Sequence, residues 1–281
     1  MLLRFISIVA AGLLLSACTY RIAERNIVIP KPGELVQAGQ RDGGRWTVTP
    51  LAITADDGFN LHGAVFRKAG SMGRVLYFGG NGFVLSKHAD FVLREYRDLP
   101  LDVVIFDHRG YGANPGETSM RALFDDGLTV YDGVRAAVPG PGPLLVHGHS
   151  LGSFIAGEVA SKRTLDGLIL ESTATTTQDW VNSMAGAKRH LVRLRIDEEL
   201  KDQGNLHVMA GLDEPLLIVS GEKDTVTRPV MARALYAAAA LPTDRKELLV
   251  VPGANHMQAS TSPEFVAAVQ RLLEKATPPA P

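Results

Sequence analysis

Cysteine is nearly absent from this sequence of 281 residues, and the only one, Cys18, lies close to the N-terminus. An excess of charge of one sign is also lacking: the formal net charge is −1 and the isoelectric point is about 6.7. Nothing therefore indicates a nucleic-acid partner. The sequence has no Walker-type phosphate loop, no Rossmann glycine fingerprint, no His-Glu-x-x-His motif and no Cys/His cluster. We expect neither a cofactor nor a metal.

The N-terminus has the pattern of a bacterial lipoprotein. Arg4 precedes the apolar run 5–15, which is too short for a membrane span and predicts a signal peptide over residues 1–17. The sequence Leu-Ser-Ala-Cys at 15–18 resembles a lipobox, in which Cys18 is acylated and becomes the first residue of the mature protein. The alternative is an unmodified cysteine in a plain signal or anchor. We expect lipid anchoring in the bacterial cell envelope, with Thr19 favouring the periplasmic face of the outer membrane.

Glycine and proline divide the rest of the chain. Residues 18–45 are rich in both and predict a lipid-anchored tether, part of which, such as residues 27–29, packs on the folded domain. The domain itself is expected over 46–275, with an insert that forms a lid or cap over 173–213. Residues 276–281 predict a disordered, proline-rich tail.

Strand and helix patterns alternate along the domain, which indicates an α/β fold with a mainly parallel sheet. Residues 46–54 and 60–66 flank Asp56-Asp57-Gly58 and predict an antiparallel hairpin. Six apolar runs of the buried-strand type follow, at 75–78, 103–106, 144–146, 168–170, 216–219 and 248–251. The expected sheet has eight strands. Helical spacing of apolar residues predicts a helix over 121–138 capped by Ser119, and a last helix after Ser262-Pro263.

The strongest motif is Gly148-His149-Ser150-Leu151-Gly152, directly after the fifth expected strand. A tight strand-to-helix turn needs small residues at both ends, and it exposes the serine hydroxyl above the sheet. We therefore expect Ser150 to be a nucleophile. A helix-capping serine is the alternative interpretation.

A serine hydroxyl needs a general base, and the base needs an orienting carboxylate. In folds built around this turn the acid and then the histidine follow the serine along the chain. Of the eight histidines, His256 alone lies in a loop after the final strand, so we expect it to be the base. The loop after residues 216–219 contains the acid, for which we favour Asp224 over Glu222.

An oxyanion needs preorganised N–H donors. The turn places the backbone N–H of Leu151 at the expected position. We expect the glycine-rich loop 79–82 to supply the second donor, and we favour Asn81 over Gly82. The alternative is a glycine-rich turn with no catalytic part.

These motifs together resemble those of α/β-hydrolase-fold serine hydrolases, over about residues 46–275. The likeness is greatest to membrane-tethered alpha/beta hydrolase domain proteins and serine aminopeptidase-like hydrolases. Such proteins have a His-Gly-Asn loop, here 79–81, and an Asp-x-Arg-Gly-Tyr-Gly segment, here 107–112. Gly-x-x-Asp and Gly-x-x-His segments match at 221–224 and 253–256. The resemblance implies an eight-stranded, mostly parallel sheet flanked by helices, with the lid between strands six and seven.

Two positions depart from this pattern. Gly79 replaces the usual histidine, and Asn114 replaces a serine that often follows the Arg-Gly-Tyr-Gly segment. Asp107 and Arg109 are expected to brace the loop rather than to act on substrate. The insert carries Trp180 and a basic run from Lys188 to Arg195, which either contacts an anionic group or phospholipid surface or is an ordinary solvated helix face.

The resulting hypothesis is hydrolysis of an acyl ester, from a small molecule or a lipid, through a covalent acyl-enzyme. Ser150, His256 and Asp224 form the triad, and the N–H groups of Leu151 and Asn81 form the oxyanion hole. The same triad also serves thioesterases, peptidases and acyltransferases, and a hydrolase-fold lipoprotein that only binds a ligand is the alternative of a different class.

Overall fold

A computed structural model describes residues 19–185 and 193–277 of the chain. The expected signal peptide and Cys18 lie outside these residues, as do Lys188, Arg189 and His190 of the insert. None of the helices within the described ranges has the length and apolar character needed to cross a membrane.

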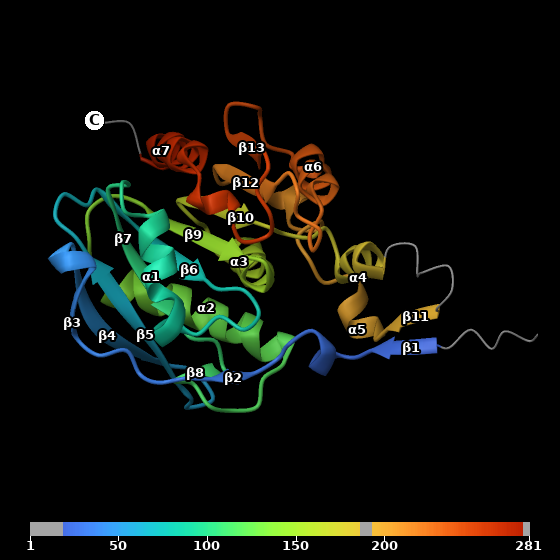
Figure 1. Ribbon diagram of the computed structural model, residues 1–281, viewed down its shortest axis with the longest axis horizontal. Helices are drawn as coiled ribbons and strands as arrows, with labels where there is room; N and C mark the ends of the chain where they lie inside the picture. Colours follow the sequence, from blue (N-terminus) through green and yellow to red (C-terminus); the bar gives the residue numbers. More distant parts are fainter. Residues whose placement is uncertain (1–18, 186–192, 278–281) are drawn as a thin grey trace, which may run out of the picture.

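A nine-stranded sheet forms the centre of the molecule, in the order β13-β12-β10-β9-β6-β7-β5-β4-β3 (Figure 1). All pairs from β13 to β7 are parallel, and β7-β5, β5-β4 and β4-β3 are antiparallel. The strands are β3 (Gly39–Arg41), β4 (Trp46–Thr54), β5 (Asn60–Arg67), β6 (Gly73–Phe78), β7 (Leu101–Phe106), β9 (Leu144–His149), β10 (Gly167–Glu171), β12 (Leu216–Gly221) and β13 (Lys246–Val251). This arrangement is the α/β-hydrolase fold that the sequence predicted.

All eight expected strands are present, and β3 adds a ninth that was not expected. It pairs antiparallel with β4, so that β4 is not the edge of the sheet. A strand of three residues has no hydrophobic period that a sequence pattern could reveal.

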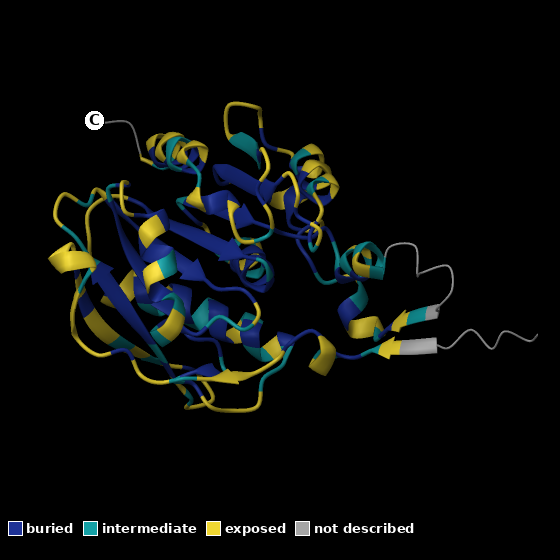
Figure 2. Ribbon diagram, in the orientation of Figure 1, coloured by how far each residue is buried: buried dark blue, intermediate teal, exposed yellow. Residues whose placement is uncertain are grey.

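Helices cover both faces of the sheet. They are α1 (Leu85–Glu95), α2 (Met120–Ala137), α3 (Leu151–Lys162), α6 (Pro229–Ala238) and α7 (Pro263–Ala276). The central strands are buried throughout (Figure 2). Their side chains alternate between two cores. On β6, for example, Val75 and Tyr77 pack in the core with α1 and α7, whereas Leu76 packs with α2, α3 and α6.

Local capping explains where two of the helices begin. The Ser119 hydroxyl accepts the N–H of Ala122 at 3.0 Å, and α2 starts at the next residue after Ser119. At α7 the Ser262 hydroxyl accepts the N–H of Phe265 at 3.2 Å, and Pro263 occupies the first helical position. Both caps were predicted.

The N-terminal segment has more contact with the domain than a free tether would have. It contains β1 (Thr19–Ile22), which pairs with β11 (Arg193–Ile196), and β2 (Lys31–Pro32), which pairs with β8 (Tyr111–Gly112). Ile27 and Val28 are buried, as expected for residues 27–29, although Ile29 is exposed. In Figure 1 this segment runs along the domain from β3 to the β1–β11 ribbon.

The insert between β10 and β12 lies beside that ribbon. Its described residues form α4 (Thr177–Ala185), β11, α5 (Glu198–Lys201) and a 3-10 turn at Met209–Gly211. Figure 1 shows α4 and α5 next to β1 and β11, beyond the carboxyl ends of the central strands. At the C-terminus, α7 continues through Ala276, and residues 278–281 lie outside the described part.

Candidate active site

Ser150 lies at the turn between β9 and α3 and has backbone angles φ 52° and ψ −117°. Residues with a Cβ rarely adopt a positive φ, so this turn is strained. Two glycines allow it, because a Cβ at Gly148 would overlap the carbonyl of Gly152 and a Cβ at Gly152 would overlap the carbonyl of Phe78. The Ser150 N–H donates to the carbonyl of Glu171 at 3.0 Å, which fixes the turn against β10.

The three side chains expected to form the triad lie in one hydrogen-bonded row. The Ser150 Oγ is 3.0 Å from His256 Nε2, and His256 Nδ1 is 2.8 Å from Asp224 Oδ2. The Asp224 side chain is fully buried, whereas 17% of the His256 side chain is exposed. Glu222, the alternative acid, instead accepts the N–H of Gly253 at 2.8 Å.

The turn after β12 holds Asp224 as a carboxylate. Its Oδ1 accepts the N–H groups of Val226 and Thr227 at 2.8 and 2.9 Å, and its Oδ2 accepts the Thr227 hydroxyl at 2.9 Å. Burial alone would raise the pKa of Asp224, but His256 and these donors outweigh it and lower that pKa. Asp224 can therefore orient the His256 ring and stabilise a positive charge on it.

A second set of contacts holds the backbone of the His256 loop. The carbonyl of His256 accepts His149 Nε2–H at 3.0 Å and the Ser172 hydroxyl at 3.0 Å. The His149 and His256 rings lie 5.3 Å apart, and burial lowers the pKa of His149, which favours the neutral ring. Sequence reasoning did not identify His149 or Ser172, because nothing in their spacing shows what they contact.

The two expected oxyanion donors, Leu151 and Asn81, belong to residues that line the same pocket as Ser150. Leu151 is the first residue of α3, and among the described residues neither its N–H nor that of Asn81 has an acceptor. Asn81 lies at the corner of a turn that the Phe83 N–H closes onto the carbonyl of Gly80 at 3.0 Å. Gly82, the alternative donor, is the next residue of this turn and has a φ of 81°.

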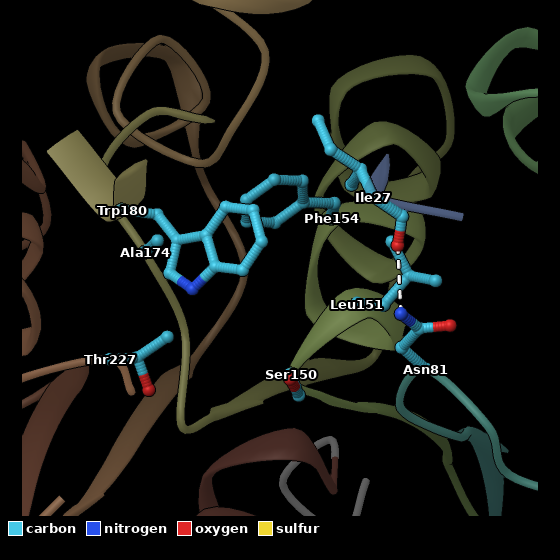
Figure 3. Close-up of a pocket in the computed structure, with 8 residues that line it drawn as sticks. All are labelled: Ile27, Asn81, Ser150, Leu151, Phe154, Ala174, Trp180 and Thr227. Carbon is cyan, nitrogen blue, oxygen red and sulfur yellow. Dashed lines mark hydrogen bonds between the residues drawn. The ribbon is translucent and has the colours of Figure 1, made fainter. Parts of the chain in front are cut away.

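The N-terminal segment holds Asn81 in place. Its Nδ2 donates to the carbonyl of Ile27 at 2.8 Å (Figure 3), and its Oδ1 accepts the Tyr111 hydroxyl at 2.8 Å and the Ile29 N–H at 3.3 Å. The nitrogen and the oxygen of the Asn81 side-chain amide therefore both form hydrogen bonds with groups other than Ser150. This leaves the backbone of Asn81, rather than its side chain, free to face a substrate.

The departure at Gly79 has a structural explanation. A Cβ at this position would overlap the ring of Phe83, so Phe83 fills the space of the missing side chain. The carbonyl of Gly79 accepts His108 Nε2–H at 2.8 Å, which holds the loop from the β7 side.

The segment 107–114 braces the loops next to the site, as expected. Asp107 accepts the N–H groups of Leu85 and Ala113, and Arg109 forms a two-pronged ion pair with Asp126 at 2.7 and 2.9 Å. The buried Asn114 amide donates to the carbonyl of Asp107 at 2.6 Å and accepts the N–H of His62 at 2.8 Å. Asn114 therefore joins this segment to β5.

A pocket of about 390 Å³ opens beside Ser150. Its walls are mostly apolar, and Figure 3 shows Trp180 and Phe154 across from Ser150, with Ile27 and Leu151 to one side. Trp180 comes from α4 of the insert and Ile27 from the N-terminal segment. The N-terminal segment and the insert thus both form walls of the pocket.

A buried polar network lies beneath the site. Glu171 at the end of β10 accepts the Ser260 N–H at 3.0 Å, and the Ser260 hydroxyl donates to Glu95 at 2.6 Å. His147 bonds to the Tyr96 hydroxyl at 2.6 Å, and its Nε2 lies 3.2 Å from Glu171 without the angle of a hydrogen bond.

The two carboxyl groups of this network have opposite pKa shifts. Burial alone would raise the pKa of Glu171, but contacts with His147, His149 and Ser260 lower it to about 2. For Glu95, burial and then the charge of Glu171 raise the pKa well above its usual value. Glu171 is therefore the charged member, and ionisation of Glu95 is unfavourable.

Within residues 19–185 and 193–277, no group of three or more His, Cys, Asp or Glu side chains is arranged to hold a metal ion.

The fold and the site geometry define an α/β-hydrolase. A family model described as "Serine aminopeptidase, S33" matches residues 88–207. The uncharacterized protein MT2364 of Mycobacterium tuberculosis (strain CDC 1551 / Oshkosh) is 30% identical over 209 residues, which cover 73% of this chain and 71% of that protein. The chain belongs to the family of α/β-hydrolases that includes this protein.

Two further proteins are similar to the chain. Lysophosphatidylserine lipase ABHD12 of Macaca fascicularis is 28% identical over 240 residues, and the match spans 75% of this chain and 58% of that protein. The solved structure of the esterase Pf2001 from Pyrococcus furiosus superposes with a TM-score of 0.68 at 18% identity, covering 88% of this chain and 98% of that structure. The second likeness concerns the fold alone.

Substitution of Gly152 tests the packing of the serine turn. We expect Gly152→Ala to lower the free energy of unfolding by about 1–3 kcal/mol, because the new methyl group meets the fixed carbonyl of Phe78. Urea unfolding measures the change. Gly211→Ala is the matched control, since a Cβ there has no neighbour within 4 Å. Equal stability of the two variants would contradict the proposed packing.

Substitution of Glu95 tests the buried network. Its pKa is raised in the folded state, so the native chain loses stability as the pH rises above about 4.5, the usual value. Gln does not titrate, so the free energy of unfolding of Glu95→Gln, relative to that of the parent, should increase as the pH rises above this value. Urea unfolding at pH 4.5, 6 and 7.5 measures it, with the exposed Glu274→Gln as control. A difference that stays constant with pH would refute the raised pKa.

Proposed function

We propose that this protein is a serine hydrolase that cleaves carboxylic acyl esters. The observation that supports the proposal best is the hydrogen-bonded row of Ser150, His256 and Asp224 at the wall of an apolar pocket. A serine at a strained turn, within 3.0 Å of an imidazole that a buried carboxylate orients, has the arrangement of an activated nucleophile. The similarity to ABHD12, named a lysophosphatidylserine lipase, is consistent with ester chemistry.

In the proposed reaction, Ser150 Oγ attacks the carbonyl carbon of the ester and its proton passes to His256 Nε2. The negative charge that develops on the carbonyl oxygen is stabilised by the N–H groups of Leu151 and Asn81. The bond to the alcohol then breaks, and His256 returns the proton to the departing alcohol oxygen. A water molecule then attacks the acyl carbon of the acyl-enzyme while one of its protons passes to His256 Nε2. His256 gives this proton to Ser150 Oγ as the bond to the acyl group breaks, which releases the acid and free Ser150. Asp224 holds the ring and stabilises the imidazolium throughout.

Labelling and kinetics with the full chain in detergent test this proposal. We expect a fluorophosphonate probe to label the parent and to leave Ser150→Ala unlabelled. Ser150→Ala and His256→Ala should each lower kcat on a short-chain ester by at least about 10³-fold, and the double variant should lose no more, because the two groups act as a unit.

The exposed Ser161 and His207 supply matched controls, Ser161→Ala and His207→Ala, which should retain full activity. Hydrolysis of thioesters or peptides in preference to esters would redirect the proposal to another acyl group. A folded parent that neither labels nor hydrolyses any of these substrates would indicate a binding protein.

We also propose that Cys18 is acylated and anchors the protein in the cell envelope. The proposal depends on the lipobox-like sequence 15–18 and on the absence of any other cysteine in the chain. An alkynyl palmitate fed to a bacterial host should label the parent, and Cys18→Ser should abolish the label and move the protein out of the membrane fraction. Because the chain has one cysteine, a label that survives in Cys18→Ser would place the lipid elsewhere and overturn the proposal.

A further inference from the structure

Ser150 lies between two hollows rather than beside one. The first is the pocket of about 390 Å³, and the second is larger, about 1060 Å³. Asn81, Ser150 and Trp180 line both. His256 lines the larger hollow and not the smaller one, whereas Leu151 lines the smaller one and not the larger.

This division indicates which part of an ester each hollow receives, if the function proposed above is correct. The departing alcohol takes its proton from His256 Nε2, so its oxygen must lie on the His256 side of Ser150. The acyl chain then extends to the opposite side, into the smaller hollow. The walls there include Ile27, Leu151 and Phe154, which suit an apolar chain.

Three polar side chains that do not react in the proposed chemistry line the larger hollow: Tyr77, His88 and His149. Tyr77 and His149 are buried, and His149 binds the carbonyl of His256, whereas His88 is only half-buried. The N–H of Val84 donates to His88 Nδ1 at 2.8 Å, so the ring proton is on Nε2. Burial, with the positive charges of Lys31 and Lys87, lowers the pKa of His88 and favours the neutral ring. Among the described residues, Nε2 has no hydrogen-bond partner. The Phe83 ring, 5.5 Å away, is also part of the wall.

We propose that the larger hollow binds the alcohol part of the ester and that His88 Nε2–H donates to an oxygen of this alcohol. The donor lies in a wall that is otherwise largely aromatic, and an alkyl alcohol would leave it without a partner. A site with such a donor discriminates against analogues that lack the acceptor. The favoured substrates are therefore esters of alcohols that carry further hydroxyl or other oxygen groups. His88 determines specificity and does not act on the reacting bond.

Two esters with the same acid and alcohols of three carbons test the proposal in the full chain. Glycerol 1-monobutyrate has further hydroxyl groups, and propyl butyrate has none. The parent should have the higher kcat/KM for the glyceryl ester. His88→Asn retains an acceptor for the Val84 N–H but loses the donor at the Nε2 position, and it should lower the glyceryl-to-propyl ratio of kcat/KM by about 5–10-fold. His88→Gln places an amide N–H near that position and should restore much of the ratio.

The exposed His207→Asn is the matched control and should leave the ratio unchanged. A parent that prefers the propyl ester, or a ratio that is equal in the parent and His88→Asn, overturns the inference. A loss of rate in His88→Asn that is the same for both esters indicates a structural role and also overturns it. If the parent cleaves neither ester and takes no fluorophosphonate label, the proposed function itself has failed. If His88→Asn does not fold, the preference of the parent and the effect of His88→Gln still decide the question.

Discussion

The backbone of Ser150 is the constraint on which the rest of the site depends. A residue with a Cβ at φ 52° costs about 1–3 kcal/mol, and it persists only where its surroundings leave no alternative. Here the carbonyl of Glu171 accepts the Ser150 N–H. Gly148 and Gly152 let β9, α3 and β6 approach so closely that a Cβ at either position would overlap a backbone carbonyl. The strained turn places the hydroxyl where the loops after β12 and β13 can meet it.

Those loops need support of their own, because a hydrogen bond of 3.0 Å between residues 106 positions apart tolerates little movement. Residues at the carboxyl ends of β9 and β10 provide this support. His149, the last residue of β9, and Ser172, the residue after β10, bind the backbone of His256. Glu171 binds the Ser260 N–H a few residues further along the same loop. The polar groups buried under the site therefore stabilise loop positions, which explains why a charged carboxylate is retained there despite the cost of burying it.

The sheet and the row of three side chains could be predicted because each leaves a pattern in the sequence. Buried runs such as 144–146 mark the central strands, and the order of Ser150, Asp224 and His256 follows from the chain order of strands in this fold. The strands β1, β2 and β3 could not be predicted, since two to four residues carry no period. His88 and His149 were missed for another reason: which atoms a side chain meets depends on elements remote in the sequence.

The pocket walls belong to this unpredictable part, and they differ in origin from the reacting groups. Ser150, His256 and Asp224 follow strands of the central sheet, whereas Ile27 and Trp180 come from the N-terminal segment and the insert. These two segments are joined to each other by the β1–β11 pairing. Substrate choice can therefore change while the reacting groups stay in place.

The separation is not complete, because the N-terminal segment also holds Asn81. The carbonyl of Ile27 and the N–H of Ile29 bind the two ends of the Asn81 amide, whose backbone N–H is one of the two proposed oxyanion donors. A displacement of this segment would therefore alter the acyl pocket and the oxyanion loop together. In the sequence, Cys18, the residue proposed to carry the lipid anchor, directly precedes β1 of this segment.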